Sequence, residues 1–143
     1  MITSKTNPKI KNVVKLQKSS ERRKQNRIII EGRREIERAL ACGFVIDTLF
    51  ICNEIAKESI DIKADVIEEV SLEVFEKIAY REGSDGLLAV AIPRYSNLKD
   101  FKPKKNPLII VLETVEKPGN LGAVMRTADA AGVDAVIIAD PRT

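Results

Sequence analysis

The chain has 143 residues, which is enough for one ordinary domain, or for a small domain and part of a second. Hydrophobic residues make up 44% of it and aromatic residues 4%, with no Trp, so Ile, Val, Leu and Ala must build a packed core. With no His and only two isolated Cys, a His-based triad is excluded and we predict no bound metal. No stretch reaches membrane-spanning length and the N-terminus lacks a signal-peptide core, so we expect a cytoplasmic protein.

The net charge of +3 conceals an uneven distribution along the chain. Residues 1–40 contain twelve Lys or Arg against four Asp or Glu, a balance of +8. Residues 41–143 contain twelve against seventeen, a balance of −5. A basic segment of this kind can attract a polyanion through counterion release, or it can be a solvated face that keeps the protein in solution. Charge by itself leaves both interpretations open.

The basic N-terminal segment predicts two helices. Over residues 7–18, Asn7 is suited to cap a helix and Pro8 to occupy its first position. The inward side of this helix is predicted to carry Ile10, Val13, Val14 and Gln17. Ser20 is predicted to cap a second, shorter helix. That helix carries Arg22, Arg23 and Lys24. These side chains fit either a charged surface or a contact with phosphate groups.

Strands and helices alternate in the next part of the chain. Short apolar runs predict strands at residues 27–31, 45–52, 66–67 and 87–92. Gly32 turns the first strand into a helix that ends at Gly43, and Ser71 caps another helix. Residues 53–63 are polar and mixed, which predicts a helical turn and a loop. Residues 94–107 are rich in Pro and Lys, so we interpret them as an interdomain linker.

One strand-helix-strand unit is predicted after this linker. Runs rich in Ile and Val at 108–112 and 133–139 have the composition of buried parallel strands, which a right-handed crossover would join. The helix between them is predicted to turn inward Leu121, Val124, Met125 and Ala128. Arg126 projects from roughly the opposite side, so the core does not need it.

Small residues form the loop that opens this helix. Pro118 and Gly119 make the turn, Asn120 is suited to cap the first helical turn, and Gly132 suits the left-handed position that ends the helix. Such a loop, at the C-terminal end of a strand, lies where open parallel sheets bind ligands. It lacks the spacing of the dinucleotide fingerprint and the Lys and Ser/Thr of a P-loop. From these residues alone, a structural crossover and a ligand-binding loop both remain open.

The string PGNLGAVMRTADAAGVDAVII closely resembles the first signature motif of the SpoU/TrmH-type RNA ribose 2′-O-methyltransferases of the SPOUT superfamily. The matching positions are Pro118, Asn120, Gly122, Arg126, Thr127, Ala128, Gly132 and Val133. The residue before the proline is usually an aspartate in this family and is Lys117 here. The resemblance implies a knotted α/β catalytic domain that binds S-adenosyl-L-methionine, methylates rRNA or tRNA, and forms a homodimer.

The resemblance also implies that Asn120 and Arg126 are catalytic residues. In the family, the arginine at the position of Arg126 is assigned the activation of the ribose 2′-OH, and the asparagine at Asn120 helps to shape the site. A guanidinium stays charged at ordinary pH, so it is a poor general base. We therefore expect Arg126 to stabilise the alkoxide that develops on the 2′-oxygen.

Residues 1–93 resemble the substrate-binding domain that precedes many SpoU-type catalytic domains, an L30e-like fold similar to a ribosomal protein family that grips bent RNA. The resembling features are SKTNPKIKNVVKL, the EG of IIIEGRREIERAL, and the stretch that starts at Gly86. The family often has Gln where this chain has Asp85. The resemblance and the basic charge together imply RNA contacts from Lys5, Asn7, Arg22, Arg23, Lys24 and Arg33.

We therefore predict an α/β chain with a small L30e-like RNA substrate-binding domain at 1–93, a linker at 94–107, and the first βαβ unit of a knotted SPOUT methyltransferase domain at 108–143. A single βαβ unit cannot cover both faces of its sheet, and the family's cofactor motifs lie later in the sequence. We expect an N-terminal fragment that is inactive alone and lacks its S-adenosylmethionine-binding residues. Two alternatives remain: a stand-alone RNA-binding module without catalysis, and a small nucleotide-binding domain in which Asp140 takes the place of the ribose-binding acid.

Overall fold

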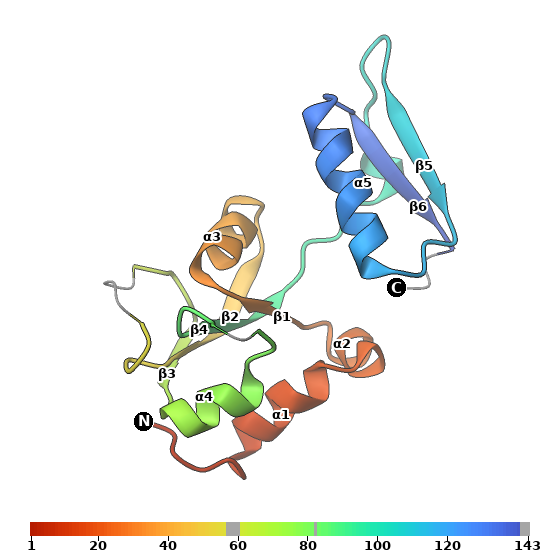
Figure 1. Cartoon of the computed structure of the whole chain (residues 1–143). Helices are drawn as coiled ribbons and strands as arrows, with labels where there is room; N and C mark the ends of the chain where they lie inside the picture. The colour runs from red at the N-terminus through yellow and green to blue at the C-terminus, as the bar shows by residue number, and fades with distance from the viewer. Residues whose placement is uncertain (57–60, 82, 141–143) are drawn as a thin grey trace. The chain divides into compact units, whose positions relative to one another are not determined.

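The computed structural model describes residues 1–56, 61–81 and 83–140 (Figure 1). The chain divides into two compact units, Met1–Tyr95 and Ser96–Thr143. This division falls inside the segment that the sequence predicts as a linker. Within the described residues, the first unit contains a four-stranded sheet and the second a two-stranded sheet.

The sheet of the first unit is mixed. Its strands are β1 (Ile28–Glu31), β2 (Val45–Ile51), β3 (Val66–Glu69) and β4 (Leu87–Ile92), in the spatial order β1-β4-β2-β3. Strand β4 runs antiparallel to β1 and β2, and β3 runs parallel to β2. All four predicted strands are confirmed, with ends that differ by at most two residues. The central strand β4 is an uninterrupted apolar run because both of its faces are covered.

Helices lie on both faces of this sheet, which makes three layers (Figure 1). They are α1 (Pro8–Leu16), α3 (Arg33–Ala41) and α4 (Leu72–Ile78), while α2 (Ser19–Gln25) packs against α1. Helices α1 and α4 share one core cluster with Leu88 and Val90, whereas Ile36 of α3 shares the other with Leu87 and Ala89. Successive residues of β4 therefore point to opposite faces, as the pleat of a strand requires.

The starts of the helices confirm one predicted cap and correct others. The side-chain oxygen of Asn7 accepts a hydrogen bond from the backbone N–H of Lys9 at 2.9 Å, so the predicted cap of α1 is confirmed. Gln17 was expected to face inward, but α1 ends before it and Leu16 is buried instead. The cap predicted at Ser20 is wrong, because α2 already begins one residue earlier. Ser71 stands at the N-cap of α4 without a side-chain capping bond.

The second unit is the predicted strand-helix-strand unit. After the short 3-10 helix η1 (Leu98–Asp100) come β5 (Ile109–Glu113), α5 (Pro118–Ala130) and β6 (Ala135–Ala139). Strands β5 and β6 pair in parallel from Ile109↔Ala135 to Glu113↔Ala139, as predicted. Gly132 has a φ of +66° just after the helix, which confirms its predicted place. Within the described part of the chain, no helix has the length and apolar character that crossing a membrane requires.

Two expectations about α5 are wrong. Asn120 does not cap the helix, because Pro118 takes the first helical position and moves the cap to Lys117. Leu121 and Val124 are partly buried and Ala128 is buried, but Met125 is 47% exposed and lies outside the inward stripe.

Strand β5 was expected to be buried, and this expectation is also wrong. Val111 is 64% exposed and Ile109 36% exposed. The reason is geometric, because one helix cannot cover both faces of a two-stranded sheet. Of the residues 53–63 that were predicted as a helical turn and loop, positions 57–60 lie outside the described residues.

Candidate functional site

The two predicted catalytic residues lie on the same helix, α5. Asn120 is in its first turn and Arg126 follows six positions later, and both side chains are exposed. At 3.6 residues per turn, six positions place the two side chains roughly 120° apart around the helix. A Cβ at Gly122 would lie 3.5 Å from Nη1 of Arg126, an ordinary van der Waals distance, so the guanidinium lies near Gly122 on the helix surface.

The turns at the C-terminal ends of β5 and β6 have an unusual backbone. Thr114 has a φ of +56° and Asp140 a φ of +48°, values that few residues other than glycine adopt. The N–H of Thr114 donates to the carbonyl of Ala139 at 3.1 Å, so the two strands end together. This edge, followed by the start of α5, is where parallel sheets place ligands. Nothing in the sequence indicated that Thr114 would turn the chain at this edge, because the turn depends on the backbone conformation of this residue.

At the other end of the same strands, a carboxylate holds the preceding segment. Asp134 accepts hydrogen bonds from Nζ of Lys104 at 2.6 Å and from the N–H of Leu108 at 3.0 Å. These two bonds, the one from Lys104 first, hold the pKa of Asp134 below its ordinary value, and the same pairing raises the pKa of Lys104. Lys104 therefore fixes the end of the predicted linker to the start of β6.

Four of the six predicted RNA-binding residues have structural contacts, and three of these four, Lys5, Asn7 and Arg22, lie on or near α1. Lys5 forms an ion pair with Glu73 at 2.6 Å, and its hydrogen bond lowers the pKa of that carboxyl. The side-chain oxygen of Asn7 is used in capping α1. Nη1 of Arg22 donates to the carbonyls of Leu16 at 3.1 Å and Gln17 at 2.7 Å, so this arginine caps the C-terminal end of α1.

The other three predicted residues lie on the surface of α2 and at the start of α3. Arg23 and Lys24 are exposed and, within the described residues, make no ion pair. The backbone N–H of Arg33 donates to Asp85 at 2.7 Å, and its guanidinium lies 3.5 Å from Glu37. The six residues therefore extend over several elements and do not form one compact cluster around a single point.

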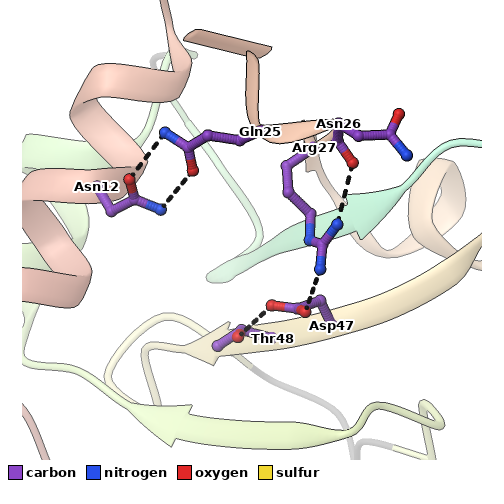
Figure 2. Close-up of polar contacts among 6 residues, drawn as sticks. All are labelled: Asn12, Gln25, Asn26, Arg27, Asp47 and Thr48. Carbon is purple, nitrogen blue, oxygen red and sulfur yellow. Dashed lines mark hydrogen bonds and ion pairs between the residues drawn. The ribbon is translucent and has the colours of Figure 1, made fainter. Parts of the chain in front are cut away.

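Side-chain amides hold α2 against α1 (Figure 2). Asn12 and Gln25 exchange two hydrogen bonds, each 3.1 Å long, between the two helices. Just after α2, Arg27 pairs with Asp47 of β2 at 3.1 Å, and Thr48 donates to the same carboxylate. These contacts fix the position of α2, so its cations are presented on a defined surface.

A second arrangement in the first unit was missed by sequence reasoning. Glu31 is the last residue of β1 and is only 9% exposed. Its carboxylate accepts from the backbone N–H of Tyr80 at 2.7 Å and of Arg81 at 3.4 Å. Tyr80 itself is 89% exposed. The residues are too far apart in sequence for any local pattern to have paired them.

Beside these residues lies a groove of about 500 Å³, called the Tyr80 groove below. Its lining includes Ile28, Ile29, Ile78, Arg22, Tyr80 and Arg81. It therefore joins an apolar floor from β1 and α4 to two arginines and an exposed aromatic ring.

Comparisons with known proteins define the class of this chain. The MRM3-like substrate binding domain matches residues 7–89, and the SpoU rRNA Methylase family matches residues 107–143. In this chain, a match to a substrate-binding domain therefore precedes a match to the SpoU family.

Individual relatives agree with this class. The 23S rRNA (guanosine(2553)-2′-O)-methyltransferase RlmP of Bacillus subtilis is 29% identical over 139 residues, which are 97% of this chain and 54% of the relative. The crystal structure of an RNA 2′-O ribose methyltransferase matches with 38% identity and a TM-score of 0.79, over 96% of this chain and 55% of that one. An AdoMet-bound rRNA methyltransferase from Sinorhizobium meliloti matches with 31% identity and a TM-score of 0.81, over 98% and 54%.

The chain belongs to the family of the MRM3-like substrate binding domain, which matches more than half of it, and residues 107–143 match the SpoU rRNA Methylase family. The resemblance found in the string that starts at Pro118 is thereby confirmed. The chain spans about half the length of the curated relatives it matches.

Proposed function

We propose that this chain is the N-terminal part of an S-adenosylmethionine-dependent RNA ribose 2′-O-methyltransferase that acts on rRNA or tRNA. The observation that carries the proposal is the match of residues 107–143 to the SpoU family, because this segment contains the exposed Asn120 and Arg126 of α5. Because the chain spans about half of its relatives, we expect the 143 residues alone to be inactive.

Arg126 is proposed to act on the ribose 2′-oxygen. As that oxygen becomes a nucleophile it acquires negative charge, and a fixed guanidinium beside it stabilises the charge. Arg126 cannot serve as the base, because it keeps its proton at ordinary pH. The exposed position of Arg126 on α5 supports this role, because a ribose could reach the guanidinium from solvent. Asn120, in the first turn of the same helix, is proposed to orient the ribose.

The residues of the second unit fit the substrate side of this reaction. The edge formed by Thr114, Asp140 and the first turn of α5 lies at the C-terminal ends of two parallel strands. S-adenosylmethionine, which is bound in the Sinorhizobium meliloti structure, would supply an electrophilic methyl group. We expect the residues that hold it in the C-terminal half of the relatives, so no residue of this chain is assigned to it.

The proposal extends to a homodimer in the cytoplasm, with residues 1–93 as the RNA-binding domain, 94–107 as the linker and 108–143 as the start of the catalytic domain. The exposed apolar side chains of Val111, Met125 and Ile138 support a larger assembly around the second unit, because further protein layers would bury them. Sedimentation of the full-length protein tests the dimer.

Methyl transfer by the full-length protein that contains these residues tests the proposal. Tritiated S-adenosylmethionine and total RNA stripped of modifications are the substrates. Arg126→Ala is expected to lower the rate by at least a factor of about one hundred, the loss typical of removing one donor to a developing oxyanion. Asp129→Ala is the matched control, because Asp129 is an exposed polar residue on the same helix.

Two results would contradict parts of this proposal. A rate for Arg126→Ala equal to that of Asp129→Ala would remove Arg126 from the reaction. RNA binding by the full-length protein without any methyl transfer would favour the alternative, an RNA-binding module. One observation supports that alternative. The first unit has two core clusters of its own, so its packing does not depend on the second unit.

A further inference from the structure

Tyr80 combines high exposure with a fixed backbone. Single exposed apolar residues are normal on protein surfaces, so an exposed fraction of 89% has no meaning by itself. The backbone of Tyr80 and Arg81, however, is tied to the buried carboxylate of Glu31 by two hydrogen bonds. The fold therefore holds an aromatic ring out of the core at a defined place.

The Tyr80 groove has the size and lining of a small-ligand site. Its volume of about 500 Å³ lies within the ~300–1,000 Å³ common for such sites. Ile28, Ile29 and Ile78 give it an apolar floor. Strand β1 is at the edge of the sheet. A second groove, of about 490 Å³, also includes Tyr80 and Arg81, so these two residues line both grooves.

Positive charge surrounds this groove. Arg22 is held in its lining by two backbone carbonyls and makes no ion pair within the described residues. Arg81 lies 3.6 Å from Glu35, and an exposed ion pair of this kind is weak and easily exchanged for another anion. The acidic group that lines the groove is Glu31, whose charge is engaged by two N–H donors. Arg23 and Lys24 continue the positive surface along α2.

We propose that the Tyr80 groove binds one unpaired nucleotide of RNA, with the base stacked on the ring of Tyr80 and a phosphate beside Arg81 and Arg22. Unpaired bases stack on exposed aromatic side chains, and arginines bind the phosphates that flank them. The proposal rests on the proposed function in one respect, namely that RNA is the substrate. It adds that the first unit selects a site with an unstacked nucleotide. A peptide strand added to β1 is the competing occupant, but it does not account for the positive charge.

Tyrosine-ring signals test the stacking directly. The sequence has two Tyr and no Trp, so isotope-labelled tyrosine gives ring signals from Tyr80 and Tyr95 alone. The Tyr95→Phe variant identifies which is which. A single-stranded RNA about twelve nucleotides long, added to the 143-residue chain, is expected to shift the Tyr80 ring signals by stacking and to leave those of Tyr95 in place. A duplex of the same sequence is expected to leave both in place.

Variants separate stacking from charge. Tyr80→Ala is expected to weaken binding of the single strand about tenfold, and Tyr80→Phe to keep it, because phenylalanine stacks equally well. Tyr95→Ala is the matched control, since Tyr95 is also highly exposed, at 72%, and does not line the groove. Arg81→Ala is expected to reduce the salt dependence of binding by about one phosphate contact. Fluorescence anisotropy of labelled RNA measures all of these.

Unmoved Tyr80 signals with RNA bound, or equal affinity of Tyr80→Ala and the unaltered chain, would overturn this assignment. The assignment would also be overturned if duplex RNA shifted the Tyr80 signals equally, or if an extended peptide shifted them and RNA did not. The methyl-transfer assay is independent of these readouts. Transfer by the full-length protein with unmoved Tyr80 signals would overturn the nucleotide site alone, and shifted signals without any transfer would overturn the catalytic proposal alone.

Discussion

The central strand β4 of the first unit and the first strand β5 of the second have similar apolar sequences and different surroundings. In β4, the first five residues are buried, whereas along β5 exposed and partly buried residues alternate. Among the described residues, every buried hydrophobic side chain except Ala128 lies in Met1–Tyr95. Strand β4 has a neighbour on each edge and helices on both faces, and β5 has one neighbour and one helix. Burial is therefore a property of the neighbours that a strand acquires, and residue type only permits it.

The largest expected effect is a difference in the stability lost when a side chain is truncated in each of the two units. Phe75 of α4 is 1% exposed within the first core cluster, so Phe75→Ala should lower the free energy of unfolding of the first unit by about 3–5 kcal/mol. Val111→Ala in β5 should change that of the second unit by no more than about 0.5 kcal/mol. Urea denaturation with hydrogen exchange resolved along the chain measures both. Equal costs would mean that β5 is covered in solution.

An intermediate effect is expected at the buried carboxylate. Glu31→Ala removes the acceptor of two backbone N–H groups and should cost the first unit about 1.5–3 kcal/mol. The same measurement applied to Glu35→Ala provides the control, because its ion pair with Arg81 is exposed and should be worth about 0.5 kcal/mol or less. A Glu31→Ala chain as stable as the control would show that water replaces the carboxylate without loss.

The smallest effect concerns the second unit and depends on pH. The pKa of Asp134 is lowered by its bonds to Lys104 and to Leu108, from an ordinary value of 3.8. Its contribution to stability is therefore complete above pH 3.8 and is lost as the pH falls through the lower folded-state pKa. The amide-proton shift of Leu108 should titrate with a midpoint below 3.8. In Lys104→Met the midpoint should rise towards 3.8. An unchanged midpoint would exclude Lys104 as the main cause of the lowered pKa of Asp134.

The two candidate sites differ in how far the sequence could predict them. Asn120 and Arg126 lie within one helix and one contiguous motif, so a local pattern was enough to find them and to place Arg126 on the exposed face. The Tyr80 groove joins residues from α2, β1 and the end of α4, and Glu31 and Tyr80 are separated by 49 positions. No periodicity or spacing rule connects such residues. The RNA contact predicted for Arg22 stays a prediction, whereas its cap of α1 rests on contacts that charge alone does not show.

The sequence by itself determined the elements of this protein, their type and the family motif. It did so because apolar period, helix caps and turn glycines act over a few residues, as at Asn7, Pro118 and Gly132. Only the tertiary structure decided that β4 lies between β1 and β2, that Met125 points to solvent, and that Tyr80 is held beside two arginines. These features depend on which distant segments become neighbours, and that is settled by packing over the whole unit.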